Sequence, residues 1–226
     1  MFKRNFAIAL VIAGLALPVV ANAADHDEEA RKIDHAARVF NEIMQTPDRA
    51  VPQNLLSSAK CIAIIPGEEK VAFIFGENAG KGVAVCRTER GWGDPIFITV
   101  GGGSFGFQIG AQSTDIVMLF MNDRALNRLL SDKFSLGGDA SVAAGPVGRA
   151  AAAGTDIGMN AEILTYARSK GVFAGISLNG AVVHADHDAD HALYNDADRH
   201  EILDGRVPEP AEAQPLIREL DQYSRA

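Results

Sequence analysis

The side chains best able to bind a metal ion lie near the end of the chain, in the sequence HADHDADH at residues 184–191. Three aspartates alternate there with the spacing that opens a calcium-binding loop: Asp186, Asp188 and Asp190. That loop needs a glycine where this sequence has His191 and a glutamate where it has Ala197. The histidines follow no zinc template. We therefore assign no metal or cofactor and expect a polar segment in which Asp188 or Asp190 caps the next helix, with metal binding as the alternative.

The glycine-rich stretch at residues 101–106 matches two chemical motifs. It contains the GxGxxG pattern of dinucleotide-binding sites and, around Ser104, the GxSxG pattern of a hydrolase nucleophile. Both motifs need a helix directly after the turn, but the sequence that follows, FQIGAQ, is a poor helix former. We therefore interpret these glycines as a structural turn or bulge. A serine hydrolase using Ser104, with Asp139 and His184 as partners, is the alternative.

The chain has two cysteines, Cys61 and Cys86, each within an apolar run of β-forming residues (CIAIIP and GVAVCR). In an exported protein, an isolated pair of this kind predicts a disulfide. The bridge would join the first core strand to the third and would stabilise the fold by about 3 kcal/mol through the loop that it closes. Two buried thiols are the alternative.

Residues 1–23 have the pattern of a secretory signal peptide. Two basic residues precede an apolar run from Phe6 to Val20, and the sequence Ala-Asn-Ala ends at Ala23. The apolar run is shorter than the roughly 20 residues that span a bilayer. We expect cleavage after Ala23 and export to a bacterial periplasm, where the protein would be peripheral to a membrane.

The net charge of the chain is acidic. It changes from -8 to -10 on cleavage, because residues 1–23 contain two basic and no acidic residues. Nucleic-acid binding needs clustered Lys and Arg side chains that contact phosphates. We therefore expect no nucleic-acid partner, and the length that remains suits one domain.

Short apolar runs and turn residues alternate through the middle of the chain. The β-forming runs are CIAIIP, VAFIFG, GVAVCR, PIFITV, EILTYARS, GVFAGISL and AVVHA, with Asn179-Gly180 as a hairpin turn between the last two. Turns this short favour antiparallel pairing. Helices are expected at Asp25–Gln45, directly after Pro52, and at 211–223. The fold class is therefore α+β: a single domain with a strongly bent, mostly antiparallel, glycine-rich, barrel-like sheet covered by helices from both termini.

Five blocks of the sequence resemble the SYLF domain of the Ysc84 family: AKCIAIIP, GKGVAVCR, GWGDPIFITVGGGSFGFQIGAQSTDIVMLFMN, LGGDASVAAGPVGR and YARSKGVFAGISLNGAVV. The resemblance extends from about Ala36 to Asn195. It implies a non-enzymatic phospholipid-binding domain, with phosphoinositides as ligands of eukaryotic members, an amphipathic N-terminal helix that assists membrane contact, and actin regulation in yeast. Because this sequence has a secretory start and no SH3 or FYVE module, we expect neither actin nor phosphoinositide as its partner.

We expect a signal peptide at 1–23, a SYLF-like domain at 24–205 and a peripheral C-terminal helix or tail at 206–226. The predicted function is phospholipid binding at the cell envelope; a ligand-free envelope scaffold is a further alternative to the hydrolase. The candidate lipid contacts are one apolar residue and cations on the first helix or beside turns: Arg31, Lys32, Arg38, Phe40, Arg87, Lys133, Arg149 and Lys170.

Membrane contact is expected to depend on an apolar row on the first helix, formed by Ile33, Ala37, Phe40 and Met44. Acidic residues share that helix with its cations, so the electrostatic attraction to anionic lipid is weak. Burial of the row in the membrane interface would then supply the binding energy. Packing of the same row on the domain's own core is the alternative.

Overall fold

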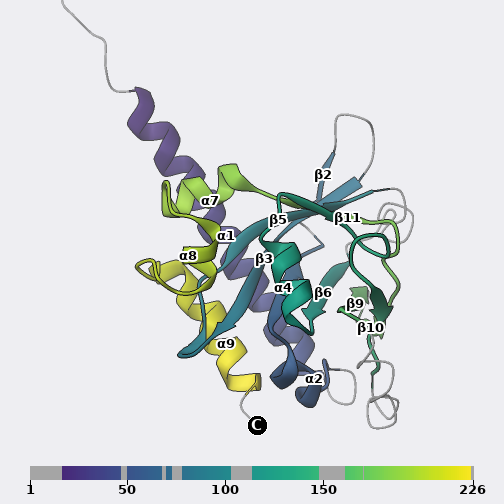
Figure 1. The fold of residues 1–226 in the computed structure, drawn as a ribbon. Helices are drawn as coiled ribbons and strands as arrows, with labels where there is room; N and C mark the ends of the chain where they lie inside the picture. Colours follow the sequence, from purple (N-terminus) through teal and green to yellow (C-terminus); the bar gives the residue numbers. More distant parts are fainter. Residues whose placement is uncertain are drawn as a thin grey trace, which may run out of the picture.

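A curled sheet of mostly antiparallel strands forms the centre of the computed structural model, and helices from both ends of the chain cover it (Figure 1). The structure describes residues 17–46, 50–67, 70–72, 78–102, 114–147, 161–169 and 171–224. The order of the main strands is β10-β9-β6-β1-β3-β5-β11-β7. The expected α+β class, with one bent antiparallel sheet in a single domain, is confirmed.

The strands follow the apolar runs of the sequence. Their bounds are β1 Cys61–Ile65, β2 Lys70–Ala72, β3 Asn78–Thr88, β4 Gly91–Trp92, β5 Ile96–Gly101, β6 Asp115–Phe120, β7 Lys133–Ser135, β8 Val142–Ala144, β9 Ile163–Ser169, β10 Val172–Gly175 and β11 Val182–Ala185. Among these strands only β8 and β9 pair in parallel. Every residue of β1 and β5 is buried, so both faces of the sheet centre are covered.

The curl of the sheet brings β7, at one end of the strand order, toward β6 near the other end. The rings of Phe120 in β6 and Phe134 in β7 meet edge to face, with centroids 6.4 Å apart. Helix α4, Asp123–Leu129, connects these two strands, and the side chain of Asn122 caps it by accepting from the Ala125 amide at 2.9 Å. The connection explains how a helix comes to lie beside the open side of the curl (Figure 1).

The remaining helices come from the two ends of the chain: α1 Leu17–Met44, α2 Gln53–Ser58, α7 His187–Tyr194, α8 Arg199–Leu203, the 3-10 helix η1 Ala211–Ala213 and α9 Gln214–Ser224. Helix α1 begins before the expected start at Asp25, and therefore runs through the expected cleavage position, which stays a prediction. In the part of the chain that the structure describes, no helix is long and apolar enough to cross a membrane.

The C-terminal helix is part of the core rather than peripheral. Leu216 and Leu220 of α9 are fully buried. The ring of Tyr223 contacts that of Phe40 in α1, with 6.0 Å between centroids, and Ser224 accepts a hydrogen bond from the indole of Trp92 at 3.0 Å. The expected boundary at residue 206 therefore cuts through one packed unit.

The turn predicted at Asn179-Gly180 is present, but the strands that flank it do not pair with each other. β10 pairs with β9, whereas β11 pairs with β5 and β7. Gly102, directly after β5, has a positive φ of 114°, and a Cβ there would lie 3.1 Å from the carbonyl oxygen of Gly180. This supports a structural role for Gly102; Ser104 and the other residues of 103–113 lie outside the described part of the chain.

Candidate functional site

The apolar row of α1 packs on the domain's own core. Ile33 and Phe40 are fully buried, Ala37 is 4% exposed, and Met44 packs against the same core. α1 lies along β1, β3 and α9, which cover this face of the helix. Contact of the row with a bilayer would therefore require α1 to leave the domain, and Phe40 is a core residue in this conformation.

Lys32, a predicted lipid contact, is buried in an ion-pair cluster. Its Nζ lies 2.9 Å from carboxylate oxygens of both Glu28 and Glu29. Burial acts to lower the pKa of Lys32, but the two carboxylates outweigh it and the net pKa is raised. Burial also raises the pKa of Glu29, whereas the hydrogen bond from Lys32 lowers that of the exposed Glu28. The Lys32 ammonium thus binds the protein itself.

The same cluster faces a polar cleft of about 500 Å³ between α1 and α7, which we call the α1–α7 cleft. Its lining includes Glu28, Glu29, Lys81, Asp186 and Asp188. Lys81 of β3 forms an ion pair with Asp186 at 2.8 Å. Cations from α1 and β3 therefore pair with three of the five carboxylates that line the cleft where α1, α7 and the sheet meet.

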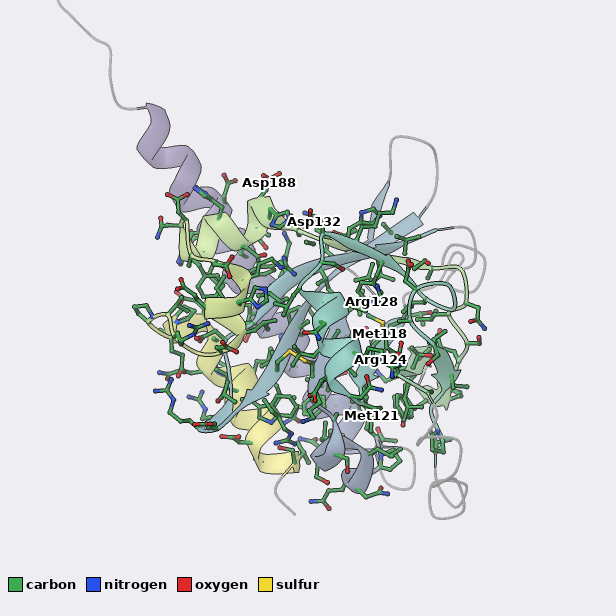
Figure 2. The ribbon with its side chains drawn as sticks, in the orientation of Figure 1. Met118, Met121, Arg124, Arg128, Asp132 and Asp188 are labelled. Atoms are coloured by element: carbon green, nitrogen blue, oxygen red, sulfur yellow. A yellow bond between two sulfur atoms is a disulfide. The ribbon has the colours of Figure 1, made fainter. Side chains whose placement is uncertain are left out.

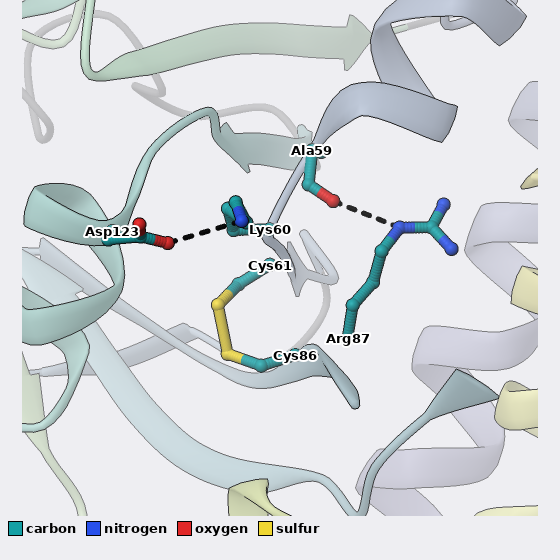
Figure 3. Close-up of a disulfide and its surroundings, with 6 residues drawn as sticks. All are labelled: Ala59, Lys60, Cys61, Cys86, Arg87 and Asp123. Atoms are coloured by element: carbon teal, nitrogen blue, oxygen red, sulfur yellow. Dashed lines mark hydrogen bonds and ion pairs between the residues drawn. A yellow bond between two sulfur atoms is a disulfide. The ribbon is translucent and has the colours of Figure 1, made fainter. Parts of the chain in front are cut away.

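Arg87 also has an internal role. Its guanidinium donates to the carbonyl oxygens of Ala59 and Leu56, at 3.0 and 3.1 Å, and lies 4.2 Å from the centre of the Trp92 ring. Figure 3 shows the bond to Ala59 beside the disulfide. Burial lowers the pKa of Arg87. The side chain fixes the end of α2 to β3 instead of reaching a headgroup.

The predicted disulfide is confirmed. Cys61 of β1 lies directly opposite Cys86 of β3 in the antiparallel register, and their sulfur atoms are bonded (Figure 3). The bridge spans 25 residues of sequence and joins the first strand to the third, as expected. Lys60, which precedes the bridge, pairs with Asp123 of α4 at 3.2 Å.

The other predicted cations are on different elements. Arg31 and Lys133 are exposed on α1 and β7, and Arg38 pairs with Asp34 at 3.1 Å. Arg149 and Lys170 lie outside the described residues. Figure 2 shows two further cations on α4, Arg124 and Arg128, which the sequence reasoning did not select; the Arg124 guanidinium lies 3.4 Å from Glu162.

The aspartate-rich segment at 184–191 forms the end of β11 and the start of α7. Asp186, not Asp188 or Asp190, caps the helix by accepting from the Ala189 amide at 3.4 Å. Asp190 is buried, where it accepts from the Phe97 amide at 2.7 Å and pairs with Arg199. Among the residues that the structure describes, no group of His, Cys, Asp and Glu is arranged to hold a metal.

The β9–β10 hairpin carries the exposed apolar side chain. Val172, the first residue of β10, is 57% exposed and is the one large hydrophobic residue recorded as exposed in the described part of the chain. The hairpin has a firm base, because the Arg168 guanidinium lies 2.7 Å from both Asp115 of β6 and Glu42 of α1. Tyr166 and Phe173 stack across the two strands with centroids 5.3 Å apart. A well-anchored hairpin thus presents Val172 to solvent.

Comparison with known proteins identifies the family. A family model described as "Ysc84: Las17-binding protein actin regulator" matches residues 101–223, which is more than half of the chain. The chain belongs to the Ysc84 family. The matched segment of this Ysc84-family chain begins at the last residue of β5 and ends inside α9, so the family model covers both the hairpin and the C-terminal helix.

Eukaryotic relatives match a longer stretch. The human SH3 domain-containing YSC84-like protein 1 is 33% identical over 201 residues, which are 87% of this chain and 58% of the relative. Protein YSC84 of Saccharomyces cerevisiae is 34% identical over 214 residues, 92% of this chain and 45% of the relative. This Ysc84-family chain therefore spans between 45% and 58% of their length. Neither of these two relatives is named as an enzyme.

Proposed function

We propose that this Ysc84-family chain is a non-enzymatic protein that binds phospholipid at a membrane surface of the bacterial cell envelope, after export directed by residues 1–23. The observation that carries the proposal is Val172 at the hairpin between β9 and β10. Lys170 precedes it by two positions in the sequence. An apolar side chain that enters the interface beside a cation that meets phosphate is the combination used by peripheral membrane proteins.

The hairpin is better suited to this contact than α1. The apolar row of α1 is already used in the core, and exposing it would cost the burial energy of Ile33 and Phe40, about 1.5–3 kcal/mol for each side chain. Contact through Val172 requires no loss of core packing, because its side chain is already exposed. Arg168 fixes the strands behind it, so little conformational entropy is lost on binding.

Liposome co-sedimentation of the protein purified after export tests the proposal. With vesicles of phosphatidylglycerol and phosphatidylethanolamine, Val172→Asp should reduce the bound fraction about tenfold, since a carboxylate is repelled by anionic lipid and loses the apolar contact. Lys170→Glu should act in the same direction. Intact mass spectrometry of the same sample should give the mass of residues 24–226.

Asn127→Asp is the matched control, because it adds the same charge at an exposed position on α4. All variants are checked for an unchanged circular dichroism spectrum and melting temperature. If Val172→Asp sediments as well as Asn127→Asp, the hairpin is not the membrane contact. If the parent protein sediments with no vesicle composition, phospholipid binding is itself wrong.

The description of the family model favours a second candidate, regulation of actin through a protein partner. A filamentous-actin pelleting assay with the same purified protein distinguishes it, because lipid binding predicts no pelleting with actin alone. The hydrolase alternative draws no support from its proposed acid: the Asp139 carboxylate accepts hydrogen bonds from the amide and hydroxyl of Ser135, both at 2.8 Å. A hydrolytic turnover that the parent protein shows and Ser104→Ala loses would support the hydrolase.

A further inference from the structure

A second cleft lies where the turn between β3 and β4 meets the segment after α8 and the C-terminal helix. Its volume is about 470 Å³, and we call it the Trp92 cleft. Its walls combine an apolar surface with three carboxylates, contributed by Trp92, Val207, Ile217, Asp94, Glu209 and Asp221. Arg90 is the single basic residue of the lining. Arg87, which stacks on Trp92 outside this lining, offsets the charge of Asp221. Asp94 and Glu209 then face the one guanidinium of Arg90, so the cleft favours a cation.

Asp94 is the residue that indicates a ligand. It is 3% exposed, and its Oδ1 has no hydrogen-bond partner among the residues that the structure describes. Burial, reinforced by the negative charge of Glu209 and opposed by Arg90, raises the pKa of Asp94 to about 6. A buried carboxylate oxygen without a donor is costly, and folded proteins rarely keep one without a use. The position therefore calls for a hydrogen-bond donor from outside the chain.

Arg90 does not supply that donor. Its Nη2 donates to the Gly205 carbonyl at 2.6 Å, which holds the guanidinium on the loop after α8. The Trp92 indole donates to Ser224, so its polar edge is also satisfied within the protein. A ligand would thus meet apolar contact along Val207 and Ile217 and, after a turn of the Asp94 carboxylate that brings the buried Oδ1 to the cleft, an acceptor at Asp94.

We propose that the Trp92 cleft binds an organic primary ammonium group, which donates to Asp94 while its alkyl chain lies along Val207 and Ile217. A primary ammonium has three N–H donors and a positive charge, so it satisfies both the unpaired oxygen and the acidic lining. A trimethylammonium group has the charge but no donor, and leaves Oδ1 unsatisfied. The site is separate from the β9–β10 hairpin and does not rest on lipid binding.

Two sources offer this chemistry: a free alkyl diamine and the side chain of a lysine. Trp92 is the only tryptophan of the chain, so its fluorescence reports on the cleft directly. Exported protein is titrated with 1,5-diaminopentane, with Nα-acetyl-lysine amide and with choline, and isothermal titration calorimetry measures each affinity. We expect saturable binding of at least one primary amine and at least tenfold weaker binding of choline. The amine that binds more tightly identifies the source.

Asp94→Asn should weaken amine binding at least tenfold, because it removes the charge and places an amide against the ammonium. Glu209→Gln, at the exposed rim, should weaken it two- to fivefold. Glu89→Gln is the matched control: it removes an equal charge from the neighbouring exposed turn and does not line the cleft. Absence of saturable binding, choline binding as tight as the diamine, or equal losses in Asp94→Asn and Glu89→Gln would each overturn the proposal.

Discussion

The α1–α7 cleft and the Trp92 cleft are alike in volume, about 500 and 470 Å³, and both are rich in carboxylates. They differ in how those carboxylates are satisfied. In the α1–α7 cleft, Lys32 and Lys81 reach the acids from α1 and β3. In the Trp92 cleft, Oδ1 of Asp94 has no hydrogen-bond partner in the described part of the chain. Carboxylates therefore hold secondary-structure elements together in one cleft, whereas in the other they leave an acceptor for a ligand.

The largest expected change in the free energy of unfolding comes from removing Lys32, which pairs with Glu28 and Glu29. Lys32→Met leaves Glu29 buried without its partner, which should lower the free energy of unfolding by about 3 kcal/mol. Urea unfolding followed by circular dichroism measures the loss. Arg31→Met, at the exposed neighbouring position, should change stability by no more than about 0.5 kcal/mol. Equal losses in the two variants would mean that the cluster is not structural.

Removing the charge of Asp94 in the Trp92 cleft should raise the stability of the protein, whereas removing Lys32 lowers it. Asp94→Asn should raise the free energy of unfolding at pH 7 by about 1 kcal/mol, because ionised Asp94 opposes folding. Its folded pKa of about 6 lies above the ordinary 3.8, so this penalty is complete above pH 6 and absent below 3.8. The gain should therefore shrink as the pH falls through 6. A destabilised Asp94→Asn protein would show that Asp94 has a structural partner.

The smallest change in the free energy of unfolding is expected at Glu28, the exposed partner of Lys32. Glu28 is an exposed member of an i,i+4 pair with Lys32, and Glu29 would still hold the ammonium in its absence. Glu28→Gln should therefore lower the free energy of unfolding by less than about 0.5 kcal/mol. Thermal unfolding beside Lys32→Met gives the comparison. A loss as large as that of Lys32→Met would make the exposed carboxylate the main partner.

Features encoded by neighbouring residues were predictable from the sequence. The described strand runs, the helix after Pro52 and a turn at Asn179-Gly180 are where local pattern places them, although the strands beside that turn do not form the predicted hairpin. The bridge between Cys61 and Cys86 followed because both lie in apolar runs of an expected exported protein. Which strands pair with each other could not be predicted. β11 pairs with β5, which is far away in the sequence, and no local pattern specifies that choice.

The candidate site was predicted less well than the fold, because charge and exposure depend on distant neighbours. An apolar row on a helix fits a membrane or a core equally, and only the packing of α9 on α1 shows which surface covers Phe40. From the sequence, Arg87 was interpreted as a cation beside a turn. The structure places its guanidinium over the Trp92 ring, a contact that no local pattern indicates. Asp94 did carry a signal: it is an acid enclosed by Trp92, Gly93 and Pro95 in an apolar block.

The contact between α1 and α9 has a consequence for biosynthesis. The first helix of the chain is covered by the last, with Phe40 against Tyr223 and Asn41 hydrogen-bonded to Glu219. A nascent chain therefore cannot complete this part of its core until α9 has left the ribosome. Premature termination before Gln214 would leave the Phe40 face without its cover and mark the product for proteolysis.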